Sequence, residues 1–214
     1  QRLSGKVVRS SDDGQQATVE VTAAADVARG SFDIWLENAA GESSKLKLYI
    51  DDIAQDTDAE LEPSKSAFKI VKTPVSIWGK VAKPGEVDRF AFDGVAGQTI
   101  VLELAGRSIG GKGNLVTSLA DGRRQQLASE HAADREGDSH LAVKLPADGR
   151  YFVQVQDLMM QGGKEHDYRL TIGELPYVVA AYPLSVPANQ ESDLELIGYN
   201  LPPVSKVTVK AGAS

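Results

Sequence analysis

The stretch EVDRFAFDGVAGQTIVLELA, residues 86–105, decides the fold because apolar residues recur at every second position in two separate runs. Alternate side chains of a β-strand point to the same face, so Phe90 and Phe92 face one way in the first run. Asp93 and Gly94 lie between the runs, and both residues tolerate the backbone conformations of a turn. Two amphipathic strands in succession predict an antiparallel sheet with one buried face.

The same alternation recurs along most of the chain, which predicts an all-β protein built as an antiparallel sandwich. The other segments with a period of two are ATVEVTA (17–23), SFDIWLEN (31–38), KLKLYI (45–50), HLAVKLP (140–146), RYFVQVQDL (150–158), DYRLTIG (167–173), DLELIG (193–198) and SKVTVKA (205–211). Convincing helical periodicity is missing, and only RRQQLASEHAA, residues 123–133, could form a short helix.

Composition excludes several classes of function. The 214 residues carry a net charge of −7 and no cluster of basic residues, so we expect no nucleic-acid partner. Without cysteine there is no disulfide framework, no thiolate nucleophile and no cysteine zinc site. No apolar run approaches the roughly 20 residues of a membrane helix, and residues 1–14 lack the apolar region of a signal peptide. We therefore expect no membrane insertion. Because the sequence starts without Met and ends in VKAGAS, we expect it to be an internal piece of a longer protein.

Two segments interrupt the strand pattern and predict domain boundaries near residues 53 and 174. Residues 51–66 are acidic and poor in apolar side chains, as a linker would be, and residues 173–187 contain three prolines. The predicted units are 1–53, 54–174 and 175–214. The central unit has the length of a complete sandwich, whereas each flank supplies too few strands to close one.

The central unit resembles the bacterial pre-peptidase C-terminal (PPC) domain. The resemblance rests on AELEPSKSAFKI (59–70), VSIWGKVAKPGEVDRFAFDGVAGQTIVLELAG (75–106) and LPADGRYFVQVQDLMMQGGKEHDYRLTIG (145–173). It implies a jelly-roll-like β-sandwich that is appended to secreted or surface proteins, often hydrolases, and is not itself catalytic. The flanks are similar to partial Ig-like units of the IPT/TIG kind: 1–53 to the end of such a unit and 175–214 to the beginning of the next.

Acidic residues near the start of the central unit are the candidate metal site. Asp56, Asp58, Glu60 and Glu62 alternate along an extended stretch, and Glu86 and Asp88 share the strand face of Phe90 and Phe92. A row of carboxylates repels itself, and Ca²⁺ with its six to eight oxygen ligands would neutralise it. A solvated acidic linker, with Asp88 bonded to backbone N–H groups at a strand end, explains the same residues.

The resemblance adds a ligand set to this prediction. Collagen-binding domains of bacterial collagenases, which are relatives of the PPC domain, hold calcium with an acidic segment and nearby loop carboxylates. The matching positions are Glu60, Glu62, Glu86 and Asp88. Lys65 departs from that pattern, because it puts a positive charge where a further ligand would stand.

Other chemical motifs favour structural roles. GRSIG (106–110) has the spacing of a nucleophile elbow around Ser108, but the elbow requires a following helix, and the sequence predicts a turn. His131, His140 and His166 lack metal-site spacing, although His131 with Asp134 and Asp138 could form a loop site.

Exposed aromatic and apolar side chains are candidates for binding. Trp35 and Trp78 are either core residues or rings for stacking on sugars, and Met159 with Met160 forms an apolar loop that could contact a partner.

These features together predict a non-catalytic accessory or scaffold module of a secreted or surface bacterial protein. We expect it to lie in the periplasm, outside the cell or on its surface, where it positions or stabilises neighbouring domains of the same polypeptide. One alternative is a module for carbohydrate or extracellular protein that is stiffened by calcium. Another is a fragment of a secreted hydrolase whose catalytic domain lies outside this chain.

Overall fold

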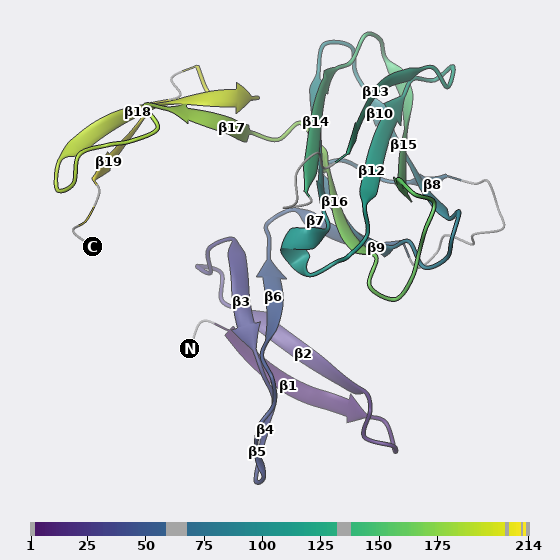
Figure 1. The fold of residues 1–214 in the computed structure, drawn as a ribbon, viewed down its shortest axis with the longest axis vertical. Helices are drawn as coiled ribbons and strands as arrows, with labels where there is room; N and C mark the ends of the chain where they lie inside the picture. Colours follow the sequence, from purple (N-terminus) through teal and green to yellow (C-terminus); the bar gives the residue numbers. More distant parts are fainter. Residues whose placement is uncertain (1–2, 59–67, 132–137, 204–205, 211, 213–214) are drawn as a thin grey trace. The chain divides into compact units, whose positions relative to one another are not determined.

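A computed structural model of the chain describes residues 3–58, 68–131, 138–203, 206–210 and 212 (Figure 1). The chain divides into two compact units, Gln1–Ile53 and Ala54–Ser214. Nearly all regular structure in the described residues is β-strand, and one 3₁₀ turn, η1 (Arg107–Ile109), is the exception. The all-β sandwich predicted from the alternating pattern is confirmed. The three-unit division, with its second boundary near 174, stays a prediction.

The first layer of the sandwich is a five-stranded sheet in the order β13-β12-β15-β10-β8. Its strands are β8 (Lys69–Ile70), β10 (Val87–Gly94), β12 (Leu115–Ala120), β13 (Gln126–His131) and β15 (Gly149–Asp157). β13 covers most of residues 123–133, so this segment forms a strand in place of the short helix that the sequence left open. Antiparallel hydrogen bonds to β12 satisfy this backbone, and pairing of this kind overrides weak helix propensity.

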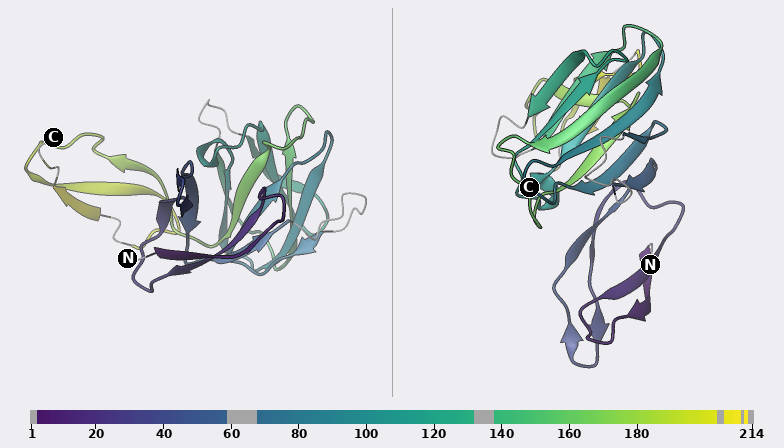
Figure 2. Two further views of the ribbon diagram at one scale, coloured as in Figure 1. Left: turned by 90° about the horizontal axis from the view of Figure 1, so that it is seen from below. Right: turned by 90° about the vertical axis from the view of Figure 1, so that its right-hand side faces the viewer.

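The second layer is a five-stranded sheet in the order β14-β11-β16-β9-β7. Its strands are β7 (Ala54–Thr57), β9 (Val75–Lys80), β11 (Thr99–Ala105), β14 (Ser139–Lys144) and β16 (Asp167–Gly173). The two layers face each other in both views of Figure 2. Most neighbours are antiparallel, as predicted, but β7 pairs with β9 and β8 pairs with β10 in parallel.

The parallel pairs arise because the chain crosses from one layer to the other between successive strands. β7 and β9 belong to one sheet, and β8, which lies between them in sequence, belongs to the other. In the register, Ala54 at the start of β7 pairs with Val75, and Val75 pairs with Ile172 near the end of β16. The first and last strands of the sandwich therefore begin and finish at the same end of one sheet.

The core lies between the two layers and contains the inward-facing residues of nearly every strand. Its largest fully buried side chains are Tyr168, Phe90, Phe92, Ile77, Ile100, Leu102, Leu104, Leu119, Leu145, Leu170, Ile172 and Val81. Burying an aliphatic or aromatic side chain of this size contributes about 1.5–3 kcal/mol each, so this cluster is the main source of stability. The alternation that predicted the strands also places these residues inside.

The remaining strands form small sheets whose apolar side chains stay partly exposed. In the first unit, β1 (Leu3–Ser10) pairs with β2 (Ala17–Ala23), β3 (Gly30–Ile34) with β6 (Leu46–Ile50), and β4 (Glu37–Asn38) with β5 (Gly41–Glu42). β17 (Tyr177–Tyr182), β18 (Glu191–Tyr199) and β19 (Lys206–Lys210) form a three-stranded sheet. The Ig-like character of both flanks stays a prediction.

Candidate functional site

The carboxylate of Asp88 is part of the core. Asp88 is 4% exposed, and its Oδ2 accepts a 2.7 Å hydrogen bond from the hydroxyl of Tyr168. Asp88 lies near the start of β10 and Tyr168 near the start of β16, so the bond joins the two sheets. The shared strand face of Asp88 and Phe90 is therefore the buried face. The donor that makes this burial tolerable is a tyrosine 80 residues away.

Two further residues shape the surroundings of this pair. Asp58 follows β7, and its Oδ2 accepts a 2.7 Å hydrogen bond from the backbone N–H of Lys80. Gly79, on β9, pairs directly with Tyr168, and a Cβ at this glycine would overlap the Tyr168 phenol. The absence of a side chain at residue 79 is thus what lets the Tyr168 ring lie against β9 and reach Asp88.

The carboxylates raise one another's affinity for protons. The pKa of Asp88 is raised to about 7, chiefly because burial removes water from the carboxylate, and the negative charges of Asp58 and Glu86 add to the shift. Burial also raises the pKa of Asp58, with a contribution from Glu86. Asp88 is therefore a neutral acid over much of the range in which ordinary aspartates are charged.

The structure brings together two of the four predicted calcium ligands and a third acid that was not in the set. Glu60 and Glu62 lie outside the described residues. Glu86 accepts a 2.8 Å hydrogen bond from the backbone N–H of Lys83, and Asp88 is bonded to Tyr168. Among the residues that the structure describes, no group of three or more His, Asp or Glu side chains could hold a metal ion. The calcium site stays a prediction.

Removal of calcium tests that prediction directly. Calcium bound through Glu60, Glu62, Glu86 and Asp88 should raise the melting temperature of the chain relative to the same chain in EDTA. Calcium at 100 times its Kd would add about 2.7 kcal/mol to the free energy of unfolding. Glu86→Gln should remove the difference, since it deletes a charged ligand near the surface. Equal melting temperatures in calcium and in EDTA would exclude the site.

The GRSIG motif forms a turn, as the sequence predicts. After β11 the chain makes the single 3₁₀ turn η1 and ends it at Gly110, whose φ is 93°. The Asp138 carboxylate accepts hydrogen bonds from the backbone N–H groups of Gly106 and Ser108, at 2.8 and 3.3 Å. An isolated 3₁₀ turn, held by a carboxylate, differs from the strand–turn–helix that presents a nucleophilic serine.

The histidines lie in different parts of the structure. His131 is exposed at the end of β13, and the ring of His140 packs 4.8 Å from that of Tyr177. Of the loop-site candidates that would join His131, Asp138 holds the η1 turn and Asp134 lies outside the described residues.

His166 lies beside a carboxylate that organises a loop. Its Nε2 is 3.7 Å from Oδ2 of the buried Asp157, a residue that the sequence reading did not single out. Asp157 also accepts hydrogen bonds from the backbone N–H groups of Asn114, Met159 and Gln161. It thereby fixes the loop that exposes Met159 and Met160.

The two tryptophans belong to different compact units. Trp35 is 46% exposed in the first unit, with the ammonium of Lys45 5.0 Å from its ring centroid. Trp78 lies on β9 in the second unit, and its indole N–H donates a 2.9 Å hydrogen bond to the Gln55 side chain.

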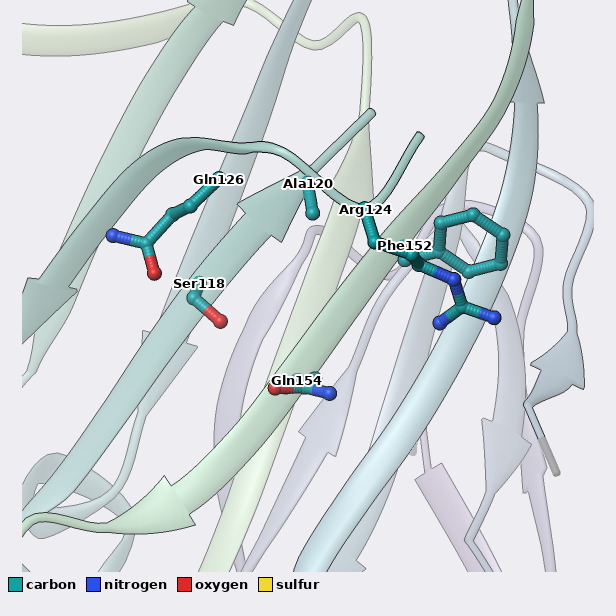
Figure 3. Close-up of a pocket in the computed structure, with 6 residues that line it drawn as sticks. All are labelled: Ser118, Ala120, Arg124, Gln126, Phe152 and Gln154. Carbon is teal, nitrogen blue, oxygen red and sulfur yellow. The ribbon is translucent and has the colours of Figure 1, made fainter. Parts of the chain in front are cut away.

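A polar groove on the outer face of the first layer is a feature that sequence reasoning missed. It has a volume of about 130 Å³ and is lined by Ser118, Ala120, Arg124, Gln126, Phe152 and Gln154 (Figure 3). These side chains come from β12, β13, β15 and the turn that joins β12 to β13. The available signal was the outward-facing half of the alternation, which includes the small polar Ser118 on β12 and the amide of Gln154 on β15.

Comparison with known proteins gives one partial relative by sequence. No protein-family model matches the chain. A protein of Deinococcus radiodurans named as a subtilase-type serine protease is 40% identical over 74 residues, which are 34% of this chain. The match covers only 10% of the length of that relative. The shared segment is thus a small part of a much longer protein.

Two solved structures that are similar to the chain come from other bacterial proteins. The PPC domain of a collagenase from Bacillus anthracis is 14% identical, with a TM-score of 0.37; the match covers 52% of this chain and 99% of that domain. A periplasmic inhibitor of g-type lysozyme from Aeromonas hydrophila is 16% identical, with a TM-score of 0.39; the match covers 56% of this chain and 98% of the inhibitor. A PPC domain is thus among the proteins to which this chain is similar, as the motifs of its central segment predict.

Proposed function

We propose that the chain is a non-catalytic accessory region of a secreted or surface protein related to proteases, in which it positions or stabilises neighbouring domains. The observation that carries the proposal is the 74-residue similarity to a small part of a protein named as a subtilase-type protease. Because the match covers only a tenth of that relative, its length leaves ample room for a catalytic domain outside the matched segment.

The chemistry of the described residues supports this role. Buried polar groups serve packing: Asp88 bonds Tyr168, Asp157 holds a loop, and the hydroxyls of Ser76 and Thr171 lie 3.4 Å apart. No helix among the described residues is long and apolar enough to cross a membrane. Because the buried polar groups serve packing, a partner would bind to the loops or outer faces of the sandwich.

Assays of the isolated chain test the non-catalytic part of the proposal. We expect no hydrolysis of activated esters or peptide amides above the buffer rate, because the Ser108 turn lacks the geometry of a nucleophile elbow. Ser108→Ala should behave identically to the wild type. Turnover that is lost in Ser108→Ala would overturn the proposal.

The accessory part is tested in the full-length product of the gene. A variant that destabilises the sandwich, Gly79→Ala, should shorten the thermal half-life of any hydrolytic activity in that protein and leave kcat on a small substrate unchanged. Gly163→Ala, whose new methyl would meet only ordinary contacts at 3.5 Å, is the matched control. A half-life that is the same in both variants would show that the module does not stabilise its neighbours.

A further inference from the structure

Arg124 is held in an unusual backbone conformation at the edge of the outer groove. Its φ is 66°, a left-handed value at which a residue other than glycine or asparagine is uncommon. The turn is fixed by Asp121, whose carboxylate accepts 2.9 Å hydrogen bonds from the backbone N–H groups of Arg123 and Gln125. An arginine at a position that would suit glycine indicates that its side chain contributes something the turn itself does not need.

The guanidinium of Arg124 is stacked on aromatic rings. Its Cζ lies 3.5 Å from the ring centroid of Phe152 and 4.1 Å from that of Phe68, and the two rings meet edge to face at 4.8 Å. Stacking leaves the N–H edge of a guanidinium free to donate hydrogen bonds in its own plane. In Figure 3 the group lies against the Phe152 ring beside the groove. The donors are thus preorganised, which lowers the entropic cost of binding.

No carboxylate among the described residues forms an ion pair with Arg124. On the same outer face, Arg89 is the direct cross-strand neighbour of Gln154, and its guanidinium donates to the backbone carbonyl of Val87. Arg124 thus lines the groove, and Arg89 lies on the neighbouring strand, both without a carboxylate partner in the part of the chain that the structure describes. Together they make this face locally positive in a chain of net charge −7.

The groove itself selects the kind of anion. The groove is small, with a volume of about 130 Å³, and its mostly polar lining suits the carboxylate of a single side chain. Stacking of a sugar ring needs an open aromatic face, but the guanidinium of Arg124 lies over the Phe152 ring. Ser118, Gln126 and Gln154 supply hydroxyl and amide groups that can donate to carboxylate oxygens.

We propose that this groove binds the carboxylate side chain of an acidic peptide segment from a partner protein. The guanidinium of Arg124 donates to the carboxylate, the amides of Gln126 and Gln154 complete its hydrogen bonds, and Arg89 adds attraction at longer range. This proposal is independent of the accessory role above, because it concerns the outer face of one layer and no neighbouring domain.

Titration of the isotope-labelled chain with two synthetic peptides tests the proposal. Acetyl-Gly-Glu-Gly-Glu-Gly-amide should shift the NMR signals of the Arg124 Nε–H and of the Gln126 and Gln154 side-chain amides in a saturable way. The corresponding glutamine peptide should not. Raising NaCl from about 0.05 to about 0.5 M should weaken binding, because the attraction is between charges.

Variants distinguish binding in the groove from a general effect of the charge of the chain. Arg124→Gln should raise Kd about 10-fold or more, the effect expected for losing a charge-assisted hydrogen bond. Arg123→Gln removes the same charge from the adjacent exposed residue outside the groove and should change Kd less than about twofold. Arg124→Lys should fall between Arg124→Gln and the wild type, because lysine keeps the charge but not the planar donor set.

Three results would overturn the proposal. One is equal binding of the glutamic acid and glutamine peptides, and the second is equal loss of affinity in Arg123→Gln and Arg124→Gln. The third is saturable binding of an oligogalacturonate at these residues without binding of the peptide, which would assign the groove to acidic sugars. Gln154→Ala, which keeps the turn intact, gives the same comparison if Arg124→Gln does not fold.

Discussion

Gly79→Ala is expected to lower the melting temperature of the sandwich by about 10 °C, because it lowers the free energy of unfolding by about 3 kcal/mol or more. A Cβ at residue 79 would overlap the Cζ and hydroxyl of Tyr168 and would lie 2.8 Å from Oδ2 of Asp58. Tyr168 is fully buried and bonded to Asp88, so its ring cannot move away without breaking that bond. The added methyl must therefore displace a strand or expel the phenol.

The control for this substitution is another glycine of the same unit. At Gly163 a Cβ would meet only ring atoms of His166, at 3.5 and 3.8 Å, so Gly163→Ala should change the melting temperature by a few degrees at most. Thermal unfolding followed by far-ultraviolet circular dichroism measures both variants. Equal melting temperatures for Gly79→Ala and the wild type would mean that Tyr168 does not pack against β9.

Between pH 4 and pH 7 the chain is expected to lose stability as the pH rises, owing to Asp88. The pKa of this carboxyl is raised to about 7 in the folded chain, chiefly by burial, whereas an unfolded aspartate has a pKa of about 3.9. The folded chain keeps a proton that the unfolded chain releases, so the free energy of unfolding falls with pH. The two pKa values differ by about three units, which corresponds to about 4 kcal/mol in the free energy of unfolding. Most of this contribution is lost by about pH 7.

Asp88→Asn isolates this effect. The amide cannot ionise, and its oxygen can still accept the Tyr168 hydrogen bond, so the variant should be more stable than the wild type at pH 8 and similar to it at pH 5. Urea unfolding in EDTA at both pH values measures the difference without interference from a bound cation. Asp93→Asn is the control on the same strand, because pairing with Arg150 lowers the pKa of Asp93 and moves its titration below this range. Asp58, whose pKa is also raised, should leave a smaller slope of the same sign, so an undiminished pH slope in Asp88→Asn would refute the assignment.

The alternating pattern was sufficient to predict the sandwich but not the pairing of its strands. Phe90 and Phe92 share a face in any strand, and burial of that face follows from their size. β7 was hidden because Ala54–Thr57 contains no apolar alternation, and its parallel hydrogen bonds to β9 come from the backbone alone. The possible helix over 123–133 does not form because its helix propensity is weak and antiparallel pairing with β12 is stronger.

The candidate site could be predicted only in part, since its partners lie far apart in sequence. The alternation placed Asp88 on the face of Phe90. Neither its bond to the Tyr168 hydroxyl nor the close approach of the Tyr168 ring to Gly79 follows from residue spacing. The groove could not be predicted from the sequence. Arg124 and Phe152 meet only because a left-handed turn folds the arginine back over β15, and the sequence DGRRQ does not specify which arginine does so.

The register of the first and last strands of the sandwich determines where the polypeptide enters and leaves it. Ala54 and Ile172 both pair with Val75, so the two attachment points lie about 10 Å apart, the width of two strand spacings. The more than one hundred residues of the sandwich therefore add little to the end-to-end distance of the polypeptide. Tension along the polypeptide would break the hydrogen bonds between β7 and β9 one at a time. We therefore expect the sandwich to offer little resistance to pulling.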